Sequence, residues 1–133
     1  MKITFIGGGN MAKALIGGLV KRGYTPSKMH VVDISKDKCA ELHNAFAVRA
    51  SPELAQAVAH SEVVILAVKP QHLREVALEL APLLEDRLVI SIAAGIRTQD
   101  IARWIGSNNI VRCMPNTPAL IRSGVTALYA TPV

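Results

Sequence analysis

The sequence predicts an α/β fold, Rossmann-like and doubly wound, with a mostly parallel sheet and helices on both of its faces. Two observations lead to this prediction. Short apolar segments of strand length alternate with segments whose apolar residues recur at helical spacing. Of the 133 residues, 50% are hydrophobic but only 4% are aromatic, so the core must be aliphatic, as in buried parallel sheets. The length is that of one domain.

The beginning of the chain has the pattern of a dinucleotide-binding loop. An apolar run is followed by G-x-G-x-x-A, formed by Gly7, Gly8, Gly9, Asn10, Met11 and Ala12, and then by a helical pattern. Gly7 would permit a tight turn, Gly9 would let the backbone approach a pyrophosphate, and Ala12 would let the helix pack on the strand. The phosphates would meet free N–H groups at the positive end of that helix. The alternative is an ordinary glycine-rich turn before an amphipathic helix.

The next segments predict a second strand over 29–33, a helix from about 36 to 44 and a short strand over 47–49. Asp33 lies 26 positions after Gly7, near the spacing at which an acidic residue meets the adenosine ribose. The alternative is an aspartate that only caps a helix or shapes a loop. Ser51 is expected to cap a small helix that Pro52 begins. Inside the first helix, Gly17 predicts a close approach to the sheet or to a neighbouring element.

The second half of the chain continues the alternation. The run 63–68 is the clearest buried strand, and Pro70 is well placed to begin the helix after it. Further strands are expected over 87–92 and 109–113, separated by a short helix that Thr98 caps, and a seventh strand could follow over 125–130. Ligands of such sheets bind beyond the carboxyl ends of the strands. The loops expected to converge there are 7–11, 33–36, 69–70 and 93–95.

Composition excludes several classes of partner. The net charge of +5 comes from scattered residues, without a basic arm or interleaved aromatic residues, so nucleic acid is a poor candidate and a small anionic ligand fits as well. Cys39 and Cys113 are far apart and are read as buried thiols in a reducing compartment. The histidines show no metal-ligand spacing. No run resembles a signal peptide or spans a membrane, so we expect a cytoplasmic protein.

Four blocks of the sequence closely resemble Δ1-pyrroline-5-carboxylate reductases. They are F-I-G-G-G-N-M-A at 5–12, A-V-K-P at 67–70, S-I-A-A-G-I at 91–96 and R-C-M-P-N-T-P-A at 112–119. The glycine loop is widespread among enzymes, whereas the V-K-P and M-P-N-T-P blocks together are much more specific. The resemblance implies reduction of the C=N bond of 1-pyrroline-5-carboxylate to L-proline with NADPH or NADH, the last step of proline biosynthesis.

The resemblance also implies roles for individual residues. The positions expected to bind the cofactor are Gly7, Gly8, Gly9, Asn10, Met11, Ala12, Asp33, Ser35, Lys36, Ser51, Ala67, Val68, Lys69, Pro70, Ala93, Ala94 and Gly95. The positions expected to border the substrate are Met114, Pro115, Asn116, Thr117 and Pro118. No catalytic acid is assigned. Lys69 is interpreted as a structural or cofactor-contacting residue because an exposed loop gives no reason for a depressed pKa.

Members of this family continue into a helical domain that forms the dimer and supplies much of the substrate pocket. The resemblance therefore implies that residues 1–133 are the NAD(P)-binding domain, with little turnover alone, of a homo-oligomer built on dimers. Two alternatives stay open. One is another NAD(P) reductase of the β-hydroxyacid dehydrogenase type, and the other is a nucleotide-sensing module without chemistry. We expect both cofactors to be accepted, because Ser35 and Lys36 could offset repulsion between Asp33 and a 2′-phosphate.

Overall fold

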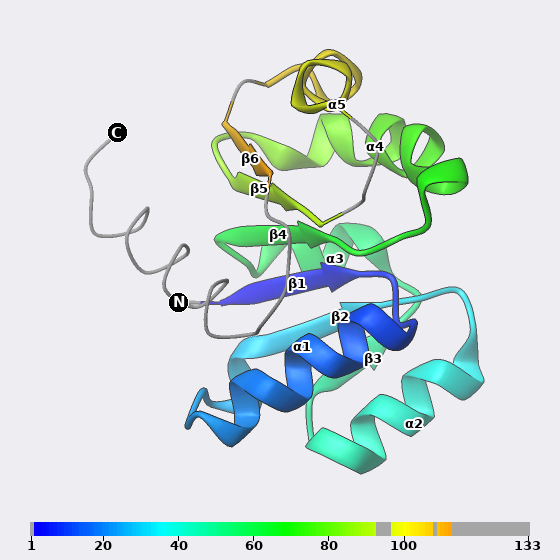
Figure 1. The fold of residues 1–133 in the computed structure, drawn as a ribbon, viewed down its shortest axis with the longest axis vertical. Coiled ribbons are helices and arrows are strands. Elements are labelled where there is room, and N and C mark those ends of the chain that lie inside the picture. Colours follow the sequence, from blue (N-terminus) through cyan, green and yellow to red (C-terminus); the bar gives the residue numbers. More distant parts are fainter. Residues whose placement is uncertain (1, 93–96, 108, 113–133) are drawn as a thin grey trace.

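The described part of the chain folds around one parallel sheet. The computed structural model describes residues 2–92, 97–107 and 109–112. Within them the strands lie in the order β3-β2-β1-β4-β5-β6, and every neighbouring pair is parallel (Figure 1). The strands are β1 (Ile3–Ile6), β2 (Met29–Val32), β3 (Arg49–Ser51), β4 (Val63–Leu66), β5 (Leu88–Ser91) and β6 (Ile110–Arg112). The predicted fold class is confirmed.

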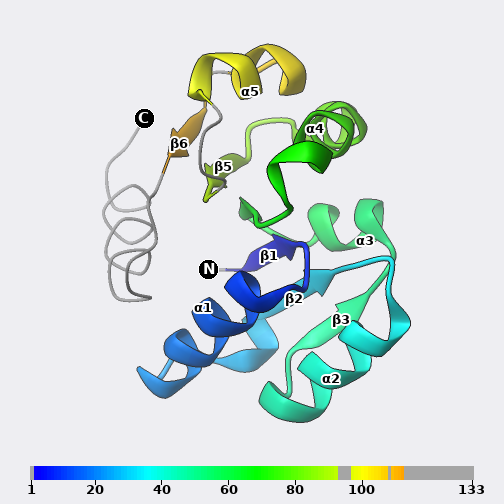
Figure 2. The ribbon, with the colours of Figure 1, turned by 45° about the vertical axis from the view of Figure 1, so that its right-hand side comes forward.

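Helices cover both faces of the sheet, as Figures 1 and 2 show. On one face lie α1 (Asn10–Lys21) and α2 (Lys36–Phe46), whose side chains pack with Phe5, Val31 and Ile65. On the other lie α3 (Leu54–Ala59), α4 (Pro70–Leu84) and α5 (Thr98–Ile105), which pack with Val64 and Leu66. A short 3₁₀ turn (Pro26–Lys28) precedes β2. Among the described residues no helix combines the length and the apolarity needed to cross a membrane.

The strand order creates a switch point between β1 and β4. The chain leaves β1 for α1 on one face of the sheet, and it leaves β4 for α4 on the other. The two chain crossings therefore diverge beyond the carboxyl ends of adjacent strands, which is the place where ligands of such sheets bind. Strand β1 is fully buried and pairs residue for residue with both neighbours, so the loop that follows it has a fixed starting point.

The structure corrects three local predictions. Helix α2 extends to Phe46 and ends where Ala47 adopts a left-handed conformation, so the next strand begins only at Arg49. Ser51 does not cap a helix, because it pairs with Val32 as the last residue of β3, and α3 follows Glu53 instead. Pairing with a distant strand prevails there over the local Ser-Pro signal.

The third correction concerns α5, whose cap is Arg97 rather than Thr98. The Arg97 backbone is extended, and its carbonyl accepts N–H groups of the first turn. Pro70 begins α4 as predicted. The expected close approach at Gly17 is confirmed as well, since a Cβ there would lie 3.2 Å from the Phe46 ring of α2. The seventh strand proposed over 125–130 lies outside the described residues.

Candidate functional site

The glycine loop between β1 and α1 lies at the switch point, and its first glycine is required by geometry. Gly7 has a φ of +105°, a conformation that residues with a side chain rarely adopt. Its N–H donates to the Val32 carbonyl at 2.8 Å, and a Cβ would lie 2.8 Å from the carbonyl oxygen of Ala67. The absence of a side chain therefore brings the loops after β1 and β4 into direct contact.

The third glycine of the loop faces open space. Gly9 is the N-cap of α1, with a φ of −76°, and a Cβ built on it would meet no atom within 4 Å. Helix α1 has neither a side-chain cap nor an acidic residue in its first turn. No described side chain therefore caps its first N–H groups, which lie at the positive end of the helix. This open cradle fits an anionic pyrophosphate.

The second glycine of the loop is hydrogen-bonded to Asp33. The Gly8 N–H donates to Asp33 Oδ2 at 2.7 Å, and the Ser35 N–H donates to Asp33 Oδ1 at 2.8 Å. The carboxylate thus fastens the glycine loop to the loop between β2 and α2, so the interpretation of Asp33 as a loop-shaping residue is confirmed. Each carboxylate oxygen keeps a second lone pair. The role of Asp33 toward a ribose stays a prediction.

The loop between β2 and α2 contains the other residues predicted for the adenosine end. Ser35 is the N-cap of α2, and its hydroxyl accepts the Lys38 N–H at 3.3 Å. Lys36 is the first residue of that helix and is exposed. Between Asp33 and Ser35 lies Ile34, whose side chain is 93% exposed. Ile34 is not among the predicted site residues, although an isoleucine inside the polar stretch D-I-S-K is a visible signal.

Ser51 lies beside Asp33 at the end of β3. Its carbonyl accepts the Asp33 N–H at 3.2 Å, while its hydroxyl is hydrogen-bonded to His30 Nε2 at 2.9 Å. Burial lowers the pKa of His30, and the charges of Arg49 and His60 lower it further. The structure places Ser51 next to the candidate site but engages its hydroxyl with His30. Its contact with a cofactor stays a prediction.

Cys39 is a buried thiol, as predicted. Its sulfur donates to the Asp33 carbonyl at 3.4 Å, and burial raises the pKa of the thiol above its ordinary value. A protonated, buried sulfur is a packing group rather than a nucleophile. Cys113 lies outside the described residues.

The loop after β4 lies against the glycine loop. Ala67 and Val68 are half-buried against Gly7, and a Cβ on Gly7 would lie 3.2 Å from Val68 Cγ1. Lys69 is exposed and serves as the N-cap of α4 through its carbonyl, which accepts the His72 N–H at 2.9 Å. This position agrees with a structural or cofactor-contacting role and supplies no burial that would make Lys69 an acid.

Two predicted groups lie outside the described residues, namely Ala93 to Gly95 and Met114 to Pro118. Their roles stay predictions. In the described ranges, no three or more His, Cys, Asp or Glu side chains gather in a way that could hold a metal ion.

An open parallel sheet, a glycine loop at its switch point and an uncapped helix N-terminus define a Rossmann-type dinucleotide-binding domain. The chain belongs to the family described as NADP oxidoreductase coenzyme F420-dependent, whose model matches residues 2–95. The predicted nicotinamide dinucleotide cofactor is confirmed at the level of this family.

Curated relatives with similar sequences carry a more specific name than the family does. The chain is 44% identical over 131 residues to the pyrroline-5-carboxylate reductase of Pseudomonas aeruginosa, covering 97% of this chain and 48% of that protein. It is also 44% identical to the Escherichia coli protein of the same name, covering 96% and 48%. The chain thus spans about half the length of the curated relatives that it matches. The resemblance found in the sequence is confirmed.

Solved structures that are similar to this chain include reductases of the same kind. A pyrroline-5-carboxylate reductase from Coxiella burnetii superposes with a TM-score of 0.82 at 41% identity, over 91% of this chain and 46% of that one. A Plasmodium falciparum pyrroline carboxylate reductase with NADP bound superposes with a TM-score of 0.77 at 28% identity, over 91% and 44%.

Proposed function

We propose that this chain is the cofactor-binding half of a pyrroline-5-carboxylate reductase, which reduces the C=N bond of 1-pyrroline-5-carboxylate to give L-proline. The observation that carries the proposal is the 44% identity to reductases of that name along 97% of the chain. In the complete protein, a helical domain beyond these residues would close the substrate pocket and form the dimers of a cytoplasmic homo-oligomer.

The chain's own residues act by binding and orientation. Gly7 fixes the turn, Gly9 leaves room for the pyrophosphate, and the first-turn N–H groups of α1 stabilise its charge. The bound reduced nicotinamide supplies the hydride. Ala67 to Pro70 and Ala93 to Gly95 would line the ribose and nicotinamide end, and Met114 to Pro118 would border the substrate. Correct placement of two reactants can lower a barrier by roughly 7–11 kcal/mol.

Cofactor choice would depend on the loop between β2 and α2. Asp33 can accept hydrogen bonds from ribose hydroxyls but repels a 2′-phosphate, whereas the exposed Lys36 attracts one. We therefore propose that both NADH and NADPH bind. Asp33→Asn should raise the affinity for NADPH relative to NADH, because it removes the charge and keeps one acceptor for the backbone N–H groups. Asp37→Asn, at an exposed position in the first turn of α2, is the matched control.

The test compares residues 1–133 with the complete protein of the proposed function, in which the helical domain follows them. The complete protein should oxidise NADH or NADPH only when 1-pyrroline-5-carboxylate is present and should form proline. Residues 1–133 alone should bind the cofactor but turn over slowly, because under the proposed function the helical domain supplies part of the substrate pocket. Binding without turnover by the complete protein would favour the nucleotide-sensing alternative, and turnover of a different substrate would favour another reductase.

A further inference from the structure

A small pocket at the amino edge of the sheet is lined by basic side chains. It lies where β1, β2 and β3 begin, beside the end of α3, and so at the opposite edge from the glycine loop. Its volume is about 20 Å³, enough for one water-sized group. Of the described residues around it, none is acidic and five are basic, namely Lys2, Lys28, His30, Arg49 and His60. We name this site the amino-edge pocket.

The register of the sheet places three polar side chains in a row beside the pocket. Thr4 of β1 pairs with His30 of β2, which pairs with Arg49 of β3, so the three side chains share one face of the sheet. The hydroxyl of Thr4 donates to the Ala57 carbonyl at 3.1 Å, which identifies this face as the one that α3 covers. His30 and Arg49 therefore lie on the side of α3, whose C-cap is His60.

The positive charges around the pocket repel one another. Burial lowers the pKa of His30, the charges of Arg49 and His60 lower it further, and Glu53 raises it to a lesser degree. In the described ranges, no side-chain hydrogen bond or ion pair is found for Lys28, Arg49 or His60. An anion in the pocket would supply the missing negative charge to all of these groups at once.

We propose that the amino-edge pocket binds a small tetrahedral oxyanion, of the class of inorganic phosphate and sulfate. Donor groups reach the pocket from the starts of three strands and from the end of α3. Donors from several directions suit a tetrahedral anion better than the two coplanar oxygens of a carboxylate. A volume of about 20 Å³ excludes a larger organic ligand and admits one oxygen, while the other oxygens would meet exposed side chains at the mouth. The inference does not depend on the proposed function.

His30 makes the binding of such an anion dependent on pH. Its Nε2 is hydrogen-bonded to the Ser51 hydroxyl at 2.9 Å, which leaves Nδ1 as the ring nitrogen for a ligand. Only the protonated ring carries an N–H on both nitrogens, so an anion should favour protonated His30 and raise its pKa. His60 should respond in the same direction. The other charged residues near His30 are of types that titrate outside the range from about pH 5.5 to about pH 8, namely Lys2, Lys28, Arg49 and Glu53.

The experiment follows the imidazole C–H resonances of the four histidines by NMR while sulfate is added. Sulfate keeps its double charge throughout the range, so any pH dependence belongs to the protein. The resonances of His30 and His60 should shift with sulfate, and those of His72, exposed on α4, should not. Sulfate should bind about fivefold more tightly at about pH 5.5 than at about pH 8, and His30→Gln should remove most of this difference.

Two matched variants separate a built site from the general charge of the chain. Arg49→Gln should weaken sulfate binding about fivefold, whereas Arg74→Gln, which removes the same charge from an exposed position on α4, should leave it unchanged. Thermal unfolding of each variant verifies that it is folded.

Equal sulfate binding by Arg49→Gln and wild type would overturn the inference, because the anion would then be held elsewhere, for example at the glycine loop. A response of all four histidines alike, or the same response to sodium chloride at equal ionic strength, would reduce the effect to general salt screening and would also overturn it. Acetate is the third comparison and should bind more weakly than sulfate. Equal affinity for acetate would contradict the assignment to tetrahedral oxyanions.

Discussion

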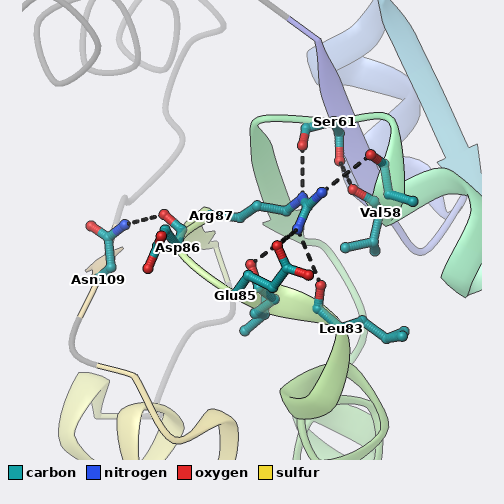
Figure 3. A network of polar contacts seen from close by, with 9 residues as sticks. Val58, Ser61, Leu83, Glu85, Asp86, Arg87 and Asn109 are labelled. Carbon is teal, nitrogen blue, oxygen red and sulfur yellow. Dashed lines mark hydrogen bonds and ion pairs between the residues drawn. The ribbon is translucent and has the colours of Figure 1, made fainter.

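The two edges of the sheet differ at several of their helix ends, although α2 at the carboxyl edge is capped by Ser35. At the carboxyl edge, α1 and α4 begin without a side-chain cap, Gly9 borders open space and Ile34 extends into solvent. At the amino edge, one guanidinium satisfies the C-terminal ends of two helices (Figure 3). At the carboxyl edge, N–H groups without a side-chain cap are available to bind an anion. At the amino edge, carbonyl groups accept hydrogen bonds from Arg87, which holds two helices together.

The guanidinium of Arg87 makes these hydrogen bonds at the amino edge, as Figure 3 shows. Its Nε donates to the Ser61 carbonyl at 2.8 Å and its Nη2 to the Ala59 carbonyl at 3.1 Å, both at the end of α3. Its Nη1 donates to the Leu83 and Leu84 carbonyls at 3.3 Å each, at the end of α4. A positive charge is favourable at both helix C-termini. Arg87 therefore joins α3 to α4 far from the glycine loop.

The largest effect on stability should come from adding a side chain at Gly7. Gly7→Ala places a Cβ 2.8 Å from the Ala67 carbonyl at a φ of +105°. We expect the free energy of unfolding, measured by urea titration, to fall by about 3 kcal/mol or more. Gly106→Ala is the control, because its φ is +69° but its surroundings are open, so only backbone strain of about 1–2 kcal/mol applies. Equal losses would mean that contact with the loop after β4 is unimportant.

The next largest effect on stability should come from removing the Arg87 side chain. Arg87→Ala should lower the free energy of unfolding by about 2–3 kcal/mol, since charged hydrogen bonds to two helix ends are lost. The NADH dissociation constant should stay unchanged. Arg97→Ala removes an exposed arginine whose ion pair with Asp100 lies on the surface of α5, so it should cost less than about 1 kcal/mol. A weakened affinity in Arg87→Ala would show that the two edges are coupled.

A smaller, stabilising effect is expected at Glu85. Its φ of +50° and ψ of −122° suit glycine, in a turn that the Arg87 N–H closes onto the Leu84 carbonyl at 2.9 Å. Glu85→Gly should raise the midpoint of thermal unfolding, by a net gain of about 0.5–1 kcal/mol. The ion pair lost with Arg87 is long, at 3.7 Å, and the Glu85 side chain is largely exposed. Asp86→Gly, at a position without a positive φ, should instead destabilise the chain.

The smallest effect should be a pH dependence from His30. Its pKa in the folded chain lies below the ordinary value of 6.5, chiefly because of burial, with Arg49 and His60 adding repulsion and nearby Glu53 opposing it. The unfolded chain therefore binds the proton more readily, so stability should fall as the pH drops below about 6.5. His30→Gln should flatten this slope, whereas His72→Gln, exposed on α4, should not. An identical slope in His30→Gln would assign the dependence to another group.

Sequence reasoning succeeded where a residue's role is local. The glycine loop, the strand before it and Pro70 at the start of α4 follow from patterns within a few positions. It failed at Ser51, whose place in β3 depends on pairing with β2. It could not find the role of Arg87, because the helix ends that it joins are brought together only by the folded chain. Exposure of Ile34 is likewise a property of the fold.

The most direct test of the account is the affinity of Gly9→Val for NADH. The position is open and its φ of −76° suits any residue, so the variant should unfold at the wild-type temperature. The added side chain would occupy the space of the pyrophosphate, and we expect binding to weaken by roughly 100-fold or more, about 2.7 kcal/mol. Ala45→Val, at an exposed position on α2, should bind like the wild type. Equal affinity of Gly9→Val and wild type for NADH would contradict the account.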